Sequence, residues 1–153
     1  MPFVLGKYQY LNYNNQDRKM VIKADQIFVV DKNSIHRNLI KYHLNVNKFS
    51  RVQPFSSGDE CLYRIYKNTI PDFIVVDYDP DNFTGFDFIK KVKRAAPQVH
   101  IIFFTTNDDP ILAVKLLEAG ASDYLVKTSK IDFGISELIK NIKFIIRDPV
   151  ISD

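Results

Sequence analysis

Four short apolar segments constrain the fold of this chain more than any other feature of its sequence. The segments are Gln26–Asp31, Asp72–Asp77, His100–Thr105 and Asp123–Lys127. They are continuously apolar rather than alternating, which is typical of strands that are buried on both faces in a parallel sheet. In an open parallel sheet, ligands bind beyond the carboxyl ends of the strands. The residues that end these segments are therefore expected to lie together at one edge of the sheet.

Amphipathic segments separate the strands, and their spacing predicts helices. The predicted helices cover about residues 34–45, 57–69, 88–96, 110–119 and 135–146. Arg51–Phe55 is a weaker strand, which Pro54 places at the edge of the sheet because proline cannot donate to the next strand. The resulting alternation of strands and helices indicates a parallel sheet with helices on both faces.

Composition limits the classes of function. A chain of 153 residues has the size of one domain, and its net charge of +3 comes from scattered lysines, so binding of nucleic acid is not predicted. The single cysteine, Cys61, excludes an internal disulfide and a zinc site built from cysteines. The sequence has neither a run of about 18 apolar residues nor the pattern of a signal peptide, so we expect a cytoplasmic protein without a membrane partner.

Three segments are expected along the chain. Residues 1–24 form an N-terminal extension that is either a tail or a short hairpin, because Tyr8, Tyr10 and Tyr13 alternate with polar residues. Residues 25–148 form the domain itself, and residues 149–153 form a C-terminal tail. A role of the extension in self-association is a hypothesis.

The ordered motifs resemble the receiver domain of response regulators in two-component signalling. The resemblance covers about residues 25–147, and its motifs are Val-Val-Asp31, Val-Val-Asp77, Gly85, Thr105 and Ala119–Lys127. It implies a flavodoxin-like, doubly wound sheet of five parallel strands in the order 2-1-3-4-5. It also implies phosphoryl-dependent signalling with no enzymatic activity beyond self-phosphotransfer and autodephosphorylation.

The resemblance also assigns roles to individual residues. Asp77 would accept a phosphoryl group from a histidine kinase or a phosphotransfer protein. Thr105 would donate a hydrogen bond to one phosphoryl oxygen, and Lys127 would pair with another. Asp31 would lie in an acidic pocket that holds Mg²⁺, and Tyr124 would be the aromatic switch residue. The chemistry agrees, since a carboxylate can form an acyl phosphate and cations must neutralise the charge of the transferred group.

Three departures from the family pattern concern this pocket. Lys32 stands where receivers usually carry a second carboxylate, and an ammonium repels Mg²⁺ and offers it no lone pair. Asp79, by its side chain or its backbone carbonyl, could complete a metal site, or its side chain could simply face solvent. Thr128 follows Lys127 where proline is common, so a cis peptide bond is not expected there.

The departures leave several functions open. The domain could accept a phosphoryl group on Asp77 with a weakened or rebuilt metal site. It could instead be a pseudo-receiver, in which Lys32 replaces Mg²⁺ by pairing with Asp31 and Asp77 and the domain binds proteins independently of phosphorylation. A flavodoxin-like binder of small molecules is a further alternative, because fold does not fix function.

A protein-binding surface is expected to carry the output, because the six residues after Arg147 cannot hold an output domain. The resemblance points to the face made by about residues 110–119, 124–127 and 135–147. Docking of a downstream partner or formation of a homodimer there is a hypothesis. The sequence leaves open whether the chain is a piece of a longer protein.

Overall fold

The computed structural model describes residues 4–5, 8–13, 17–22 and 25–147. The strands of the main sheet are β4 (Gln26–Val30), β5 (Arg51–Phe55), β6 (Phe73–Val76), β7 (His100–Thr105) and β8 (Asp123–Val126). The helices are α1 (Ser34–Val46), α2 (Gly58–Tyr66), α3 (Phe86–Ala95), α4 (Pro110–Glu118) and α5 (Ile131–Arg147). The predicted C-terminal tail, residues 149–153, lies outside the described residues.

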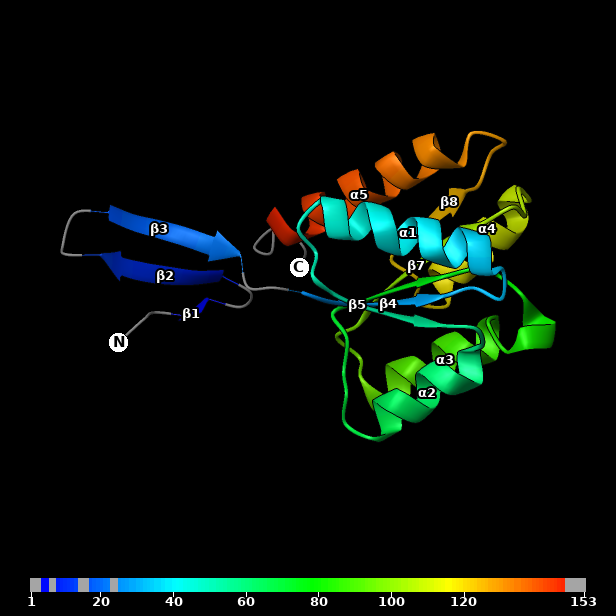
Figure 1. The fold of residues 1–153 in the computed structure, drawn as a ribbon. Coiled ribbons are helices and arrows are strands. Elements are labelled where there is room, and N and C mark those ends of the chain that lie inside the picture. The colour runs from blue at the N-terminus through cyan, green and yellow to red at the C-terminus, as the bar shows by residue number, and fades with distance from the viewer. Residues whose placement is uncertain (1–3, 6–7, 14–16, 23–24, 148–153) are drawn as a thin grey trace.

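The five strands are parallel and lie in the order β5–β4–β6–β7–β8 (Figure 1). Numbered along the main domain, this is the order 2-1-3-4-5, so the predicted flavodoxin-like sheet is confirmed. Arg51–Phe55 lies at the edge, as its proline predicts. The described backbone contains no cis peptide bond, in line with the expectation for Thr128.

Two apolar layers cover the sheet, one on each face. Successive strand residues point to opposite faces, so Val30 and Val76 pack with α2, α3 and α4, whereas Val29 and Val75 pack with α1 and α5. All four valines are at most 1% exposed. Burial on both faces explains why these strands are continuously apolar in sequence.

Side-chain caps fix where the helices begin, and these beginnings position the loops of the site. The Asn33 side chain accepts hydrogen bonds from the backbone N–H groups of Ile35 and His36, and Asp109 caps α4 through the N–H of Ile111. Such caps satisfy N–H groups that have no partner within the helix. As a result, α1 starts three residues after Asp31, directly beside the predicted site.

Gly58 allows α2 to approach the loop that follows β6. A Cβ atom at this position would lie 1.8 Å from the backbone oxygen of Phe83. Phe83 itself has φ of 55°, in the left-handed region that costs energy for a side chain of this size. The loop is therefore held in one shape by close backbone packing against the start of α2.

The N-terminal extension has strands of its own: β1 (Val4–Leu5), β2 (Tyr8–Tyr13) and β3 (Asp17–Ile22). They form an antiparallel sheet in the order β1–β2–β3, separate from the five-stranded sheet. The β2–β3 pair has the hairpin topology that was one of the two expectations for this stretch. Among the residues that the structure describes, no helix has the length and apolar character that crossing a membrane requires.

Candidate functional site

The predicted site residues meet at the edge of the sheet where its strands end. Asp31 and Asp77 directly follow β4 and β6, Thr105 ends β7, and Lys127 directly follows β8. The Lys127 Nζ atom lies 2.5 Å from Asp31 Oδ2 and 3.8 Å from Asp77 Oδ2. The structure thus brings together two carboxylates, a hydroxyl-bearing strand end and an ammonium that are far apart in the sequence.

Asp31 and Lys127 form a buried ion pair, and each of the two side chains is only 2% exposed. The second carboxylate oxygen, Asp31 Oδ1, accepts a hydrogen bond of 2.9 Å from the backbone N–H of Asn33. Both oxygens of Asp31 are therefore engaged within the protein. A buried carboxylate needs such partners, because an unpaired buried charge is costly.

His36 is a pocket residue to which the sequence analysis assigned no role. Its Nδ1 atom lies 3.2 Å from Lys127 Nζ. An ammonium can only donate, so Nδ1 is the acceptor in this contact. The signal that could have found His36 is its place in the first turn of the helix that follows Asp31.

Asp77 differs from Asp31 because one of its carboxylate oxygens has no hydrogen bond in the part of the chain that the structure describes. Its side chain is 21% exposed, and within the described residues its buried Oδ1 atom makes no hydrogen bond. Burial raises the pKa of Asp77, while the Thr105 hydroxyl and the Lys127 ammonium act in the opposite direction. Asp77 thus combines a basic carboxylate with an open oxygen, which suits a nucleophile.

Lys32 pairs with Asp79 at 3.0 Å, rather than with Asp31 and Asp77 as the pseudo-receiver hypothesis expected. The Lys32 side chain is 68% exposed and that of Asp79 is 16% exposed. The hydrogen bond and charge of Asp79 raise the pKa of Lys32, and the charges of Asp77 and Asp81 add to this. The Lys32 ammonium therefore lies at the mouth of the pocket, within the field of several carboxylates.

The backbone of Asp79 is hydrogen-bonded to the side chain of Thr84, which is a second residue that sequence reasoning missed. The Thr84 hydroxyl accepts from the Asp79 N–H at 2.8 Å and donates to the Asp79 carbonyl at 2.9 Å. The backbone N–H groups of Asn82 and Thr84 donate to the same carbonyl, each at 3.0 Å. The Asp79 carbonyl, one of the predicted metal ligands, thus accepts three hydrogen bonds.

The donors in this pocket do not fit a magnesium site. Mg²⁺ requires oxygen ligands in near-octahedral geometry. Both Asp31 oxygens and the Asp79 carbonyl already have hydrogen-bond or ion-pair partners, and Asp79 Oδ2 is engaged by the Lys32 ammonium. Asp77 Oδ1 has neither a hydrogen bond nor an ion pair among the described residues. Nowhere in residues 25–147 do three carboxylate, histidine or cysteine side chains form a group that could hold a metal ion. The predicted metal ligands lie near one another without forming a coordination shell.

Thr105 and Tyr124 are connected through the loop after β7. The Thr105 hydroxyl accepts from the Asn107 N–H at 3.3 Å, and the Tyr124 hydroxyl donates to the Asn107 carbonyl. The Tyr124 ring also packs on Phe103, with ring centroids 6.5 Å apart. Burial, together with nearby acidic residues of the same loop, raises the pKa of Tyr124. Thr105 and Tyr124 are therefore connected through their hydrogen bonds to the backbone of Asn107.

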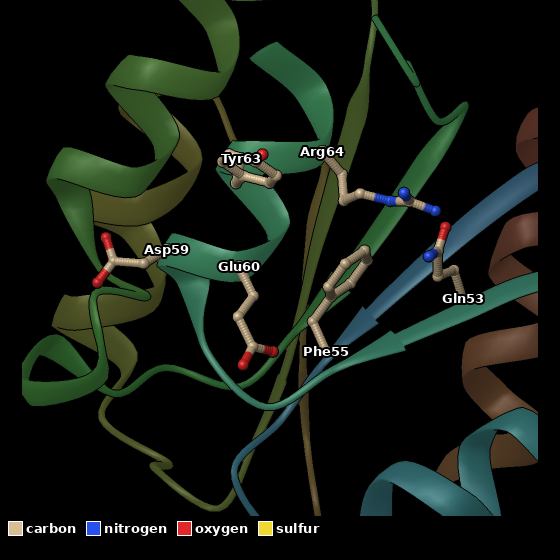
Figure 2. A pocket seen from close by; sticks show the side chains of 6 residues that line it. All are labelled: Gln53, Phe55, Asp59, Glu60, Tyr63 and Arg64. Atoms are coloured by element: carbon tan, nitrogen blue, oxygen red, sulfur yellow. The ribbon is translucent and has the colours of Figure 1, made fainter. Parts of the chain in front are cut away.

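A surface cleft of about 600 Å³ lies elsewhere, between β5 and α2. Figure 2 shows its lining residues, which are Gln53, Phe55, Asp59, Glu60, Tyr63 and Arg64. Several of its polar groups have partners: Arg64 points to Gln53, whose oxygen can accept at 2.7 Å, and Glu60 accepts from Ser56. None of the predicted site residues lines this cleft, so it adds no support to a small-molecule binder at the strand ends.

Comparison with known proteins identifies the family of this chain. Residues 27–143 match the family model described as the response regulator receiver domain. The chain is 29% identical over 103 residues to a two-component response regulator, ORR3, of Oryza sativa subsp. indica, which covers 66% of this chain and 78% of the relative. It is 26% identical over 119 residues to the chemotaxis protein CheY of Bacillus subtilis, which covers 78% of this chain and 98% of CheY.

Solved structures give the same result for the fold. A crystal structure of a putative response regulator from Chloroflexus aurantiacus superposes with a TM-score of 0.67 at 27% identity. The superposition covers 82% of this chain and 99% of that protein. The response regulator domain of Thermotoga maritima CheB has a TM-score of 0.65 at 19% identity, over 82% of this chain and 98% of that domain.

Proposed function

The chain belongs to the response regulator receiver domain family, and from this premise we propose that Asp77 is its phosphoacceptor. The observation that carries the proposal is the buried, unpartnered Oδ1 atom of Asp77 beside Lys127 and Thr105. Of the acidic residues in the pocket, Asp31 is fully engaged and Asp79 is paired with Lys32. Asp77 therefore has the carboxylate oxygen that is free to attack.

The donor is a phosphohistidine on a histidine kinase or a phosphotransfer protein. An oxygen of Asp77 attacks the phosphorus atom, the phosphorus–nitrogen bond breaks, and the leaving imidazole keeps the electron pair. The Lys127 ammonium, now 3.8 Å from Asp77, offsets the charge of one phosphoryl oxygen after a small shift. The Thr105 hydroxyl donates to another oxygen. Attack by water on phosphorus later releases inorganic phosphate and restores the carboxylate. The chemistry of the domain is therefore limited to the modification of its own Asp77.

We propose that Tyr124 connects phosphorylation of Asp77 to a change in the protein surface. When the Thr105 hydroxyl turns toward the phosphoryl group, it stops accepting from Asn107, which also holds the Tyr124 hydroxyl. Release of Tyr124 lets its partly buried ring move inward. The consequence is a new shape of the surface around α4 and β8, on which Tyr124 lies.

We further propose that this surface binds a protein partner or a second copy of the chain. Large apolar side chains are exposed on it, namely Ile111, Val114, Leu117, Val126 and Phe133. Three of them, Ile111, Val114 and Leu117, lie three residues apart along α4, and an exposed apolar patch marks an interaction site. Ile111→Asp and Val114→Asp should abolish partner capture or dimerisation in analytical ultracentrifugation, while Ile35→Asp, also at an exposed apolar residue, should not.

A phosphorylation-independent interaction module is the second candidate function. The observation in its favour is that Lys32 and the three hydrogen bonds to the Asp79 carbonyl occupy the expected metal ligands. This module would bind its partner equally well with Asp77 or with Asn at that position. Partner capture by wild type and Asp77→Asn, with and without phosphodonor, separates the two functions.

Intact-mass spectrometry after incubation with acetyl phosphate tests the phosphoacceptor directly. Wild type should gain the mass of one phosphoryl group, Asp77→Asn should gain none, and Asp79→Asn is the matched control that should still gain it. Equal adducts on wild type and Asp77→Asn, or none on wild type, would refute the proposal.

A further inference from the structure

We propose that the Lys32 ammonium takes the place of a divalent cation in this pocket, keeping metal out and stabilising the phosphoryl group itself. The first half, exclusion of metal, rests on the described geometry alone. The second half, stabilisation of the phosphoryl group, also rests on the proposed role of Asp77. Together they predict a receiver domain that needs no Mg²⁺ for transfer to Asp77.

The first argument concerns the oxygen atoms that a cation would need. The Asp31 carboxylate forms an ion pair with Lys127 and accepts a hydrogen bond from the Asn33 N–H. The Asp79 carbonyl accepts hydrogen bonds from three donors of its own loop. This loop is also held by Thr84, which is 1% exposed, so turning the carbonyl outward would break several hydrogen bonds at once.

The second argument concerns the position of Lys32. Its ammonium lies 3.0 Å from Asp79 Oδ2. The negative charges of Asp77 and Asp81 also stabilise the protonated lysine and so raise its pKa. Among the described residues, two carboxylates at this edge of the sheet therefore each pair with a lysine. The buried Lys127 pairs with Asp31, and the exposed Lys32 pairs with Asp79. A divalent cation would have to approach both ammonium groups.

The third argument concerns what happens when Asp77 is modified. A phosphoryl group adds negative charge and strong acceptor oxygens between the two lysines. Lys32 is 68% exposed, so its side chain can leave Asp79 and reach the phosphoryl oxygens without disturbing the core. Attack on acetyl phosphate then forms the bond between Asp77 and phosphorus and breaks the bond to acetate, which leaves with the electron pair. Lys32 and Lys127 neutralise the equatorial oxygens during this step.

Metal binding is tested by calorimetric titration with Mn²⁺ of unphosphorylated wild type, Lys32→Asp and Lys140→Asp. Lys140 is an exposed lysine paired with Glu137, so its variant controls for the change in net charge. Wild type and Lys140→Asp should bind alike and weakly. Lys32→Asp should bind about tenfold more tightly or better, because it adds a carboxylate and removes the ammonium. Equal affinity of all three proteins, or tight binding by wild type, would overturn the inference.

The phosphoryl half is tested by the rate of adduct formation from acetyl phosphate, measured by mass in EDTA and in Mg²⁺. Wild type should react equally in both, and Lys32→Ala should react about tenfold more slowly in EDTA. A wild-type reaction that requires Mg²⁺ would overturn the proposal. Absence of any adduct would instead refute the role of Asp77, and the Mn²⁺ titration would still decide whether Lys32 keeps metal out. Thermal melting of each variant confirms that it is folded.

Discussion

Replacing Lys127 with methionine is the perturbation whose energetic consequence follows most directly from the structure. Methionine keeps an unbranched side chain of similar size but removes the ammonium from a pair of 2.5 Å in which both side chains are 2% exposed. Asp31 would then keep one backbone hydrogen bond, from Asn33. Breaking a buried pair in this way costs about 3–5 kcal/mol, because the remaining charge is left uncompensated. In a chain of this size, that loss lowers the melting temperature by roughly 10 °C.

Urea unfolding followed by circular dichroism measures this effect, and a double-mutant cycle assigns it to the pair. Asp31→Asn combined with Lys127→Met should cost less than the sum of the two single changes, because neither charge is then left alone. Lys140→Met is the matched control, and it should change stability by at most about 0.5 kcal/mol because its pair with Glu137 is exposed. A loss below about 1 kcal/mol for Lys127→Met would refute the buried ion pair.

Three further predictions concern other parts of the pocket and its surroundings. Burial raises the pKa of Asp77, so the ionised carboxylate opposes folding above that raised value and this penalty disappears as the pH falls toward the ordinary range of aspartate. Asp77→Asn should therefore be about 1 kcal/mol more stable than wild type in urea unfolding at pH 7, with a smaller difference at acidic pH, and lower stability at pH 7 would contradict this. His36→Leu should slow adduct formation on Asp77 about tenfold relative to His36→Gln, which keeps an acceptor for Lys127, and equal rates would exclude a positioning role. Gly58→Ala should cost about 1–3 kcal/mol because its methyl group meets the Phe83 carbonyl, whereas an unchanged urea midpoint would show that the loop yields.

The sheet could be predicted from sequence because its strands are buried on both faces and the helices between them carry apolar residues at helical spacing. The order of the strands followed from the resemblance to receiver domains. The meeting of the site residues at one edge of the sheet followed from their positions at the ends of the predicted strands. The start of α5 at Ile131, earlier than the expected start near Ile135, could not be predicted, because the apolar stripe marks only the buried face of a helix.

The partners within the pocket were the part that sequence could not supply. Lys32 was recognised as a departure, yet its pairing with Asp79 depends on the path of the loop between β6 and α3. That path is set by Thr84 and by the left-handed Phe83, and neither belongs to a motif. The contact of His36 with Lys127 likewise joins residues 91 positions apart. Such contacts require the tertiary structure.

Chemical trapping of the phosphorylated residue tests the central claim most directly. Wild-type protein would be incubated with acetyl phosphate in EDTA and reduced with borohydride, which converts an aspartyl phosphate to homoserine, and its peptides would then be mapped by mass spectrometry. We predict homoserine at Asp77 and at no other aspartate, in equal amounts with EDTA and with Mg²⁺. Reduction at Asp31 or Asp79, or a product at Asp77 that forms only with Mg²⁺, would contradict this account of the pocket.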